Sequence, residues 1–269
     1  MLSTVKDKAR NLGLEPYLGK PYQLIIQNPY WFLRRRLYPK TVQNIAGIDV
    51  QFAAKDPQDI SYHEFDSETP IIKDILSEVD SNDIFCDIGA NIGLYSSVIS
   101  QRIGADNVIA FEPSPPAYEK LQKNSKFNGN FLHYQIAVSD TNETIEFAVD
   151  IGDTQSRMSS INTDSSATEY EIQEVTSRKL ATVFETEDIC SPTIIKVDVE
   201  GAEFNVLKGM GVLIDNVQII YCEIHHPVLD DFDTNGEEIT EYLESAGFNV
   251  DTLHKRGRNE FVKATREQD

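Results

Sequence analysis

Apolar residues recur along this chain with two spacings, one typical of helices and one typical of buried strands. Between Thr69 and Val79 they recur every three or four residues, which predicts an amphipathic helix. Short apolar runs such as Asp83–Asp87 and Thr193–Asp198 predict strands. By the same criteria we expect further strands at Ile45–Ala53, Ile60–Phe65, Asn107–Phe111, Phe131–Val138, Thr144–Val149, Val217–Glu223, Phe248–Leu253 and Glu260–Ala264, and helices at Leu94–Ile103, Pro115–Phe127, Ala202–Met210 and Gly236–Ser245.

Strands and helices alternate over most of the chain, which predicts an α/β fold with a doubly wound, mostly parallel sheet covered on both faces. The last two strands are joined by a few residues around Lys255–Arg258, too few for a parallel crossover, so the last strand must run antiparallel. We expect an N-terminal arm with a β-hairpin at residues 1–66 and one large domain at residues 67–269. The polar segment Asp150–Ser177 is expected to be a mobile loop.

Charge divides the chain into a basic arm and an acidic body. The formal net charge is −20, but residues 1–45 hold eight basic and two acidic residues, so they carry +6 and the rest carries −26. This acidity excludes nucleic acid as a partner, because such binding depends on Lys and Arg neutralising phosphates. It is typical of a salt-rich cytoplasm, where screening relieves self-repulsion, and it indicates a halophilic, haloarchaeal source.

The basic arm also holds aromatic residues, with Tyr30, Trp31 and Phe32 shortly before Arg34–Arg36. This combination suits an anionic membrane surface; packing on the domain or a contact between subunits is the alternative. The sequence shows no apolar run long enough to span a bilayer and no signal pattern. We therefore expect a cytoplasmic protein with a peripheral contact to the inner face of the membrane through residues 1–45.

The first candidate site lies where the strand ending at Asp87 turns into a helix through Gly89 and Gly93. In open α/β sheets, ligands lie at the carboxyl ends of the strands, and glycine lets the backbone approach them closely. The glycine spacing departs from the Gly-x-Gly-x-x-Gly of dinucleotide folds. The carboxylate of Asp87 would repel a pyrophosphate but attract an ammonium group, which favours a cationic amino-acid cofactor over NAD.

A second carboxylate, Glu112, ends the next strand. It follows Gly89 by 23 residues, close to the roughly 20 residues expected for an acid that accepts hydrogen bonds from a ribose diol. Asp87 and Glu112 on adjacent strands therefore indicate a site for S-adenosylmethionine.

A third cluster surrounds the strand that ends at Asp198. Lys196 and Asp198 share one face of this strand, and Asp198 lies where substrate meets cofactor. A charged Lys196 in an apolar strand needs a partner, and we expect it to pair with a carboxylate rather than act as a base. Glu200 follows on the loop as a functional candidate, whereas Glu203 is explained by the preference for acids in the first turn of a helix.

A fourth cluster, Glu223 and His225, ends the following strand. In one interpretation His225 is the general base that deprotonates a hydroxyl group, with Glu223 orienting it. In the other, a divalent metal lowers the pKa of that hydroxyl group. Its candidate ligands are Asp198, Glu200, Glu223 and His225. The sequence leaves both interpretations open.

Four segments together resemble the FkbM family of class I methyltransferases, over roughly residues 68–223: Asp87–Gly93, Phe111–Pro113, Ala137–Asp140 and Lys196–Glu203. The resemblance implies a Rossmann-like, seven-stranded sheet with an antiparallel last strand and S-adenosylmethionine as the cofactor. It implies cofactor contacts at Asp87, Gly89, Ala90, Asn91, Gly93, Glu112 and Asp140, the last of them near the adenine. The catalytic candidates are Lys196, Asp198, Glu200, Glu223 and His225.

The expected function is therefore O-methylation of a sugar hydroxyl in glycan assembly, with a sugar or lipid-linked glycan as the acceptor. Methylation of a non-sugar small molecule is the alternative within the same class. An NAD-dependent oxidoreductase and a cofactor-binding module without activity are the alternatives from other classes.

Overall fold

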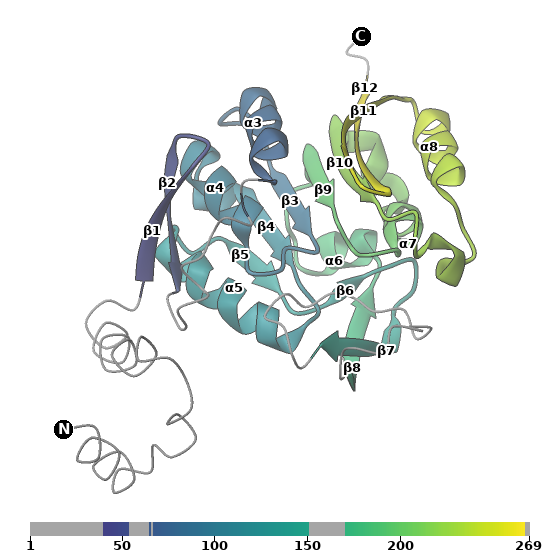
Figure 1. The fold of residues 1–269 in the computed structure, drawn as a ribbon, viewed down its shortest axis with the longest axis horizontal. Helices are drawn as coiled ribbons and strands as arrows, with labels where there is room; N and C mark the ends of the chain where they lie inside the picture. Colours follow the sequence, from purple (N-terminus) through teal and green to yellow (C-terminus); the bar gives the residue numbers. More distant parts are fainter. Residues whose placement is uncertain (1–39, 54–64, 66, 151–169, 267–269) are drawn as a thin grey trace, which may run out of the picture.

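The computed structural model describes residues 40–53, 65, 67–150 and 170–266 (Figure 1). Its centre is a seven-stranded sheet in the order β11-β12-β10-β9-β3-β4-β5. The neighbours from β10 to β5 run parallel, whereas β12 is antiparallel to both β10 and β11. The doubly wound, mostly parallel sheet with an antiparallel last strand is thereby confirmed. Its strands are β3 (Phe85–Ile88), β4 (Val108–Phe111), β5 (Leu132–Tyr134), β9 (Ile194–Val197), β10 (Ile219–Ile224), β11 (Phe248–Arg256) and β12 (Asn259–Arg266).

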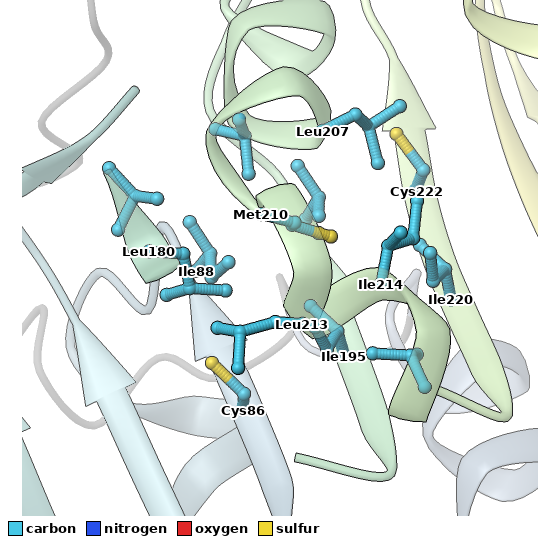
Figure 2. Packing of buried hydrophobic residues seen from close by; sticks show 14 of the residues in the cluster. Cys86, Ile88, Leu180, Ile195, Leu207, Met210, Leu213, Ile214, Ile220 and Cys222 are labelled. Atoms are coloured by element: carbon cyan, nitrogen blue, oxygen red, sulfur yellow. The ribbon is translucent and has the colours of Figure 1, made fainter. Parts of the chain in front are cut away.

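One face of the sheet packs against the helices of the second half of the chain. Cys86 and Ile88 of β3 point to this face, and Figure 2 shows Met210 and Leu213 in the same cluster of buried side chains. Because strand residues alternate between faces, the next residues along each strand lie on the other side. The covering elements are α6 (Leu180–Thr186), α7 (Glu203–Gly209), η5 (Gly211–Asn216) and α8 (Gly236–Ser245).

The opposite face packs against the helices of the first half. Phe85 of β3 and Tyr221 of β10 point into this second cluster. The covering helices are α3 (Thr69–Glu78), α4 (Leu94–Ile103) and α5 (Pro115–Phe127). The expected helices agree with α4, α5 and α8 at both ends, and α3 is one residue shorter than expected.

A β-hairpin made of β1 (Lys40–Ile45) and β2 (Ile48–Ala53) shares this second core. It turns at Ala46 and Gly47, whose φ angles are +52° and +87°, so the expected strand Ile45–Ala53 is interrupted at its start. Side chains of α5 and of the residue after it hold β2 in place, because Asn124 Oδ1 accepts from the backbone of Ala53 at 2.8 Å and Asn128 Oδ1 from that of Gln51 at 3.0 Å. The expected partner strand Ile60–Phe65 lies outside the described residues except for Phe65.

A separate three-stranded sheet, β6-β8-β7, corrects two expectations. The strand expected at Phe131–Val138 is split, since the main sheet keeps β5 while β6 (Ala137–Val138) pairs with β8 (Tyr170–Arg178). The prediction of a loop at Asp150–Ser177 is wrong from Tyr170 onward, because these residues belong to β8, which pairs antiparallel with β7 (Glu143–Asp150). Polar residues on the exposed face of β8 hide its strand pattern in the sequence. Residues 151–169 lie outside the described residues.

The helices of the described part of the chain are all too short or too polar to cross a lipid bilayer. Two short 3-10 segments, η4 (Ala105–Asn107) and η6 (Leu229–Phe232), complete the connections.

Candidate functional site

A pocket opens where β3, β4 and β9 end at the same edge of the sheet. Because β3 lies between β4 and β9, the residues that follow these three strands converge there. The pocket is lined by Gly89, Asn91, Glu112, Pro113, Phe147, Asp198, Val199 and Glu200. It therefore joins residues predicted for the cofactor to residues predicted for the acceptor.

The floor of the pocket requires glycine at position 89. Gly89 has a φ of +76°, and a Cβ atom built there would lie 1.8 Å from the backbone oxygen of Asp198. The backbone N–H groups of Gly89 and Ala90 both donate to the oxygen of Phe111, at 3.0 and 2.9 Å. The turn after β3 is thus fixed between β4 and β9, and no other side chain fits there without displacing the loop after β9.

Glu112 presents a fixed carboxylate to the pocket. Its two oxygens accept hydrogen bonds from the backbone N–H groups of Asn91 at 2.7 Å and Ser114 at 2.8 Å. Burial raises the pKa of Glu112 to about 7, although both hydrogen bonds and the charge of Lys196 act in the opposite direction. Each carboxylate oxygen can accept a further hydrogen bond, as two hydroxyl groups of a ribose would require.

Asn91 is the second polar residue available to a ligand in this half of the pocket. Its φ of +51° is uncommon for a residue other than glycine. Its Oδ1 atom is buried and has no hydrogen-bond partner among the described residues. A buried polar atom without a partner is costly, so a bound ligand that donates to it fits the site. Together with Glu112 and the backbone of Gly89, which also line the pocket, this arrangement fits the ribose and amino-acid parts of S-adenosylmethionine.

The other predicted cofactor residues do not line the pocket. Asp87 is fully buried, and its Oδ2 accepts from the Ser96 hydroxyl at 2.6 Å and the Ser96 backbone at 3.1 Å. Ala90 belongs to the hydrophobic core. A Cβ at Gly93 would lie 2.5 Å from the Leu121 side chain, so this glycine makes room for α5.

Asp140 lies at the surface of the small sheet, where its Oδ2 is 3.0 Å from Nζ of Lys208. The ion pair with Lys208 outweighs burial and lowers the pKa of Asp140. Direct cofactor contacts by Asp87, Ala90, Gly93 and Asp140 stay predictions.

Lys196 is buried beneath the pocket and forms the ion pairs that the sequence predicts. Its Nζ lies 3.1 Å from Asp198 Oδ2 and 3.5 Å from Asp87 Oδ1. It also lies 4.6 Å from the centre of the Tyr95 ring. Burial favours the neutral amine, but the charges of Asp198 and Asp87 outweigh it and raise the pKa of Lys196. These contacts favour the charged amine and agree with a pairing role, while a catalytic role of Lys196 stays a prediction.

His225 lies just beyond β10, almost completely buried among four carboxylates. Its Nδ1 is 2.7 Å from Oε1 of Glu203. Its Nε2 faces Glu200 at 3.6 Å, Asp198 at 3.7 Å and Glu223 at 3.8 Å. Burial favours the neutral ring, but the hydrogen bond to Glu203 and the surrounding negative charges raise the pKa of His225 to about 9. The charges around the ring therefore favour its protonated form, and the roles of general base and metal ligand both stay predictions.

The residue that orients His225 is Glu203, not Glu223 as the sequence suggests. Glu203 is fully buried, and the same Oε1 also accepts from the backbone N–H of Gly201 at 2.8 Å. The turn at Glu200 (φ +56°) and Gly201 (φ +115°) brings the start of α7 back toward β10. The sequence pattern hides this role, because an acid in the first turn of a helix already has a local explanation.

Glu223 belongs to a second charged group beside His225. It lies 3.5 Å from Arg256, which also forms a two-pronged ion pair with Glu68 at 2.7 and 2.8 Å. Burial and the charge of Asp198 raise the pKa of Glu223 to about 7, against the pull of His225 and Arg256. Phe147 of the small sheet also lines the pocket, and no motif in the sequence marks it as a site residue.

Known proteins resemble this chain over most of its length. The Methyltransferase FkbM domain matches residues 87–250. Hexuronic acid methyltransferase AglP from Haloferax volcanii is 26% identical over 232 residues, which cover 85% of this chain and 90% of that protein. Methyltransferase 1 from Beauveria bassiana is 26% identical over 187 residues, covering 61% of this chain and 71% of that protein.

Among solved structures, Methyltransferase FkbM from Methylobacillus flagellatus KT has a TM-score of 0.50 and 17% identity. The match covers 72% of this chain but only 46% of that one. At this identity the likeness concerns the fold, and it agrees with the sheet order described above.

Proposed function

The chain belongs to the FkbM methyltransferase family, and from this premise we propose that it methylates a hydroxyl group of a sugar in glycan assembly. Family membership makes it an enzyme that uses S-adenosylmethionine as the methyl donor, which excludes the oxidoreductase alternative. The sugar acceptor is supported by the similarity to AglP, whose name specifies a hexuronic acid.

One observation carries the proposal: a single pocket joins Glu112 to Asp198 and Glu200. Glu112 and Gly89 lie on the cofactor side, where a fixed carboxylate suits the ribose diol. Asp198 and Glu200 lie on the other side, where carboxylates suit the hydroxyl groups of a sugar because ionised carboxylates are strong acceptors. An acceptor bound there lies next to the cofactor, as methyl transfer requires.

The residues of this chain position the reacting groups. When bound, S-adenosylmethionine supplies a methyl group whose bond to sulfur breaks, with the electron pair kept by sulfur, as the acceptor oxygen forms the new O–CH₃ bond. Asp198 remains ionised, since Lys196 and His225 outweigh burial and lower its pKa. Asp198 and Glu200 hold the acceptor hydroxyl toward the cofactor side, and its proton leaves to water in the open pocket.

The experiment that tests this function is methyl transfer by the full-length protein from deuterated S-adenosylmethionine to a panel of acceptors. The panel contains a glucuronic acid glycoside, a galacturonic acid glycoside, the matching neutral glycosides and a catechol. We expect a labelled methyl group on a sugar, detected by mass spectrometry, and no product with Glu112→Ala. A product formed only from the catechol would contradict the sugar acceptor.

We also propose that the acceptor is a lipid-linked glycan and that residues 1–45 bring the enzyme to an anionic membrane. The net charge of +6 on this segment and its aromatic residues support the proposal. Residues 1–39, which hold seven of its eight basic groups, lie outside the described residues.

A further inference from the structure

The cluster around His225 has the donor set of a metal site. Asp198, Glu200 and His225 each offer one ligand atom, and these atoms all lie within 4.8 Å of one another. Asp198 and Glu200 also line the pocket, so an ion held between them would face the acceptor. Carboxylate oxygens suit Mg²⁺ and Mn²⁺, and the imidazole nitrogen suits transition metals, so Mn²⁺ fits this set better than Ca²⁺.

Two distances in the cluster are compatible with a shared ion. Two ligand atoms that each lie about 2.1 Å from one ion are about 3.0 Å apart at right angles and about 4.2 Å apart on opposite sides. The Nε2 atom of His225 lies 3.7 Å from Asp198 Oδ1 and 3.6 Å from Glu200 Oε2. Both separations fall between these limits, and both are too long for a good hydrogen bond.

The hydrogen bond at the second ring nitrogen of His225, Nδ1, provides an independent observation in favour of a metal site. His225 is 4% exposed, and its Nδ1 is held by Glu203 Oε1 at 2.7 Å. Metal-binding histidines typically donate their second ring N–H to a carboxylate, which fixes the ring and directs the other nitrogen to the ion. Nε2 faces Asp198 and Glu200 and has no hydrogen bond in the described part of the chain, so a cation that displaces its proton could bind there.

The acidic surroundings of the ring also suit a cation. Four carboxylates have an oxygen 2.7–3.8 Å from a ring nitrogen, namely Asp198, Glu200, Glu203 and Glu223. Buried carboxylates require pairing or a metal, and a divalent ion would add positive charge beside Asp198 and Glu200.

We propose that Asp198, Glu200 and His225 bind a divalent cation that chelates the acceptor sugar. The part that concerns the acceptor rests on the proposed function. A cation at this place binds the hydroxyl oxygen and lowers its pKa, so that the proton leaves to water before or during methyl transfer. It also holds a second oxygen of the acceptor, and a hydroxyl next to a carboxylate, as in a hexuronic acid, gives a chelate that a neutral sugar forms less well.

The test measures Mn²⁺ binding to the full-length protein after chelator treatment, by electron paramagnetic resonance, without cofactor or acceptor. High salt suppresses diffuse binding to the acidic surface. We expect one bound ion per chain. Glu200→Gln should weaken binding at least tenfold, and Glu203→Gln by about 10- to 100-fold. The matched control Glu241→Gln, at an exposed position on α8, should leave binding unchanged. Binding that is absent in the wild type, or equal in Glu200→Gln, would overturn the proposal.

A second measurement avoids reliance on any one variant. The bound Mn²⁺ should show a magnetic coupling to a histidine nitrogen in spin-echo experiments, and His225→Gln should remove this coupling. Its absence from the wild-type spectrum would overturn the assignment of His225. The two proposals fail separately: specific Mn²⁺ binding without sugar methylation contradicts the acceptor, whereas sugar methylation that is indifferent to chelator contradicts the metal.

Discussion

Oε1 of Glu203 lies 2.7 Å from Nδ1 of His225 and 2.8 Å from the backbone nitrogen of Gly201. One buried carboxylate oxygen thus ties the imidazole ring to the loop that follows β9. From this relationship we infer that Glu203 positions His225 beside Asp198 and Glu200, although Glu203 does not line the pocket itself. It couples the orientation of His225 to the conformation of Glu200, whose positive φ places its carboxylate opposite the ring.

The first prediction concerns this positioning role. Glu203→Ala should lower methyl transfer by about 10- to 100-fold, because the ring loses its acceptor and can rotate. Glu203→Gln should retain part of the activity, since its amide oxygen still accepts one hydrogen bond. The Nδ1 proton resonance of His225, followed by NMR, should be present in wild type and lost in Glu203→Ala. An unchanged resonance in a folded Glu203→Ala variant would contradict the positioning role, and Glu185→Gln at an exposed position of α6 serves as the control.

The second prediction separates Asp87 from the cofactor contacts. Asp87 is fully buried, with Ser96 on one oxygen and Lys196 near the other. Asp87→Asn leaves the charge of Lys196 with one carboxylate fewer, and loss of one partner of a buried ion pair costs about 3–5 kcal/mol. We expect a loss of this size in the free energy of unfolding, measured in urea. Asp215→Asn, an exposed surface change, should stay within about 0.5 kcal/mol of wild type.

The affinity of Asp87→Asn for S-adenosylmethionine shows whether Asp87 acts through the fold or contacts the cofactor directly. If Asp87 acts through the fold, affinity for S-adenosylmethionine measured on the folded fraction should change little in Asp87→Asn. A variant of normal stability that binds the cofactor poorly would instead place Asp87 in direct contact with the ammonium group, as the sequence motif suggests.

The third prediction is a pH dependence of cofactor binding that arises from Glu112. Burial raises the pKa of this carboxyl group to about 7, and the ribose hydroxyls need the ionised form as their acceptor. Affinity for S-adenosylmethionine should therefore increase as the pH rises through about 7, with release of a proton that calorimetry detects in buffers of different ionisation enthalpy. Glu112→Gln should weaken binding by roughly 1.5–3 kcal/mol and remove this part of the pH dependence. An equal pH dependence in both proteins would contradict the assignment.

The stability of the ligand-free protein should show the opposite trend. A carboxyl whose pKa is raised by folding is protonated in both states below about pH 4.5, and the unfolded chain loses this proton first. The stability associated with the protonated form is then lost as the pH rises toward 7. Between about pH 5 and pH 8, wild type should lose up to roughly 3 kcal/mol more than Glu112→Gln.

The sequence predicts the sheet well because its signals are local. Pro115 is the first residue of α5 and Gly104 follows the last residue of α4, so single residues in the sequence mark where α5 begins and where α4 ends. The short connection between β11 and β12 dictates their antiparallel pairing. The strand β8 was not predicted, because its exposed face is polar and its partner β7 lies beyond residues 151–169. The alternation of apolar and polar residues in β8 is too weak to predict a strand, and the segment forms one because it pairs with β7.

The candidate site was predictable to the extent that strand ends mark it. Gly89, Glu112 and Asp198 follow parallel strands, and parallel strands end at one edge of the sheet, so their convergence follows from the fold class. The pairing of Glu203 with His225 was not predictable, because it depends on the backbone reversal at Glu200 and Gly201. The burial of Asp87 against Ser96 depends in the same way on how the first turn of α4 sits over β3.

The fourth prediction concerns the arm. Removal of residues 1–39 leaves the hairpin from Lys40 onward, which is hydrogen-bonded to Asn124 of α5 and to Asn128 just after it and buries Val50 and Phe52. We therefore expect the truncated protein to fold and to bind S-adenosylmethionine with the affinity of the full chain. It should no longer float with vesicles that contain anionic lipids, whereas the full chain should. A full-length protein that never floats, or a truncation that unfolds, would make the arm a structural element and contradict the membrane contact.

Variants within the full chain show which force anchors the arm. At molar salt the Debye length falls to about 3 Å, so attraction between basic residues and anionic lipids is largely screened. Burial of aromatic side chains is not screened, and it must then supply most of the binding. Replacement of Trp31 and Phe32 by Ser should abolish flotation at molar salt. Replacement of Arg34, Arg35 and Arg36 by Gln should matter at about 0.1 M salt and have little effect at 1 M. The reverse result, in which the Arg replacements abolish flotation at 1 M salt and the aromatic replacements do not, would contradict this assignment of the anchoring force.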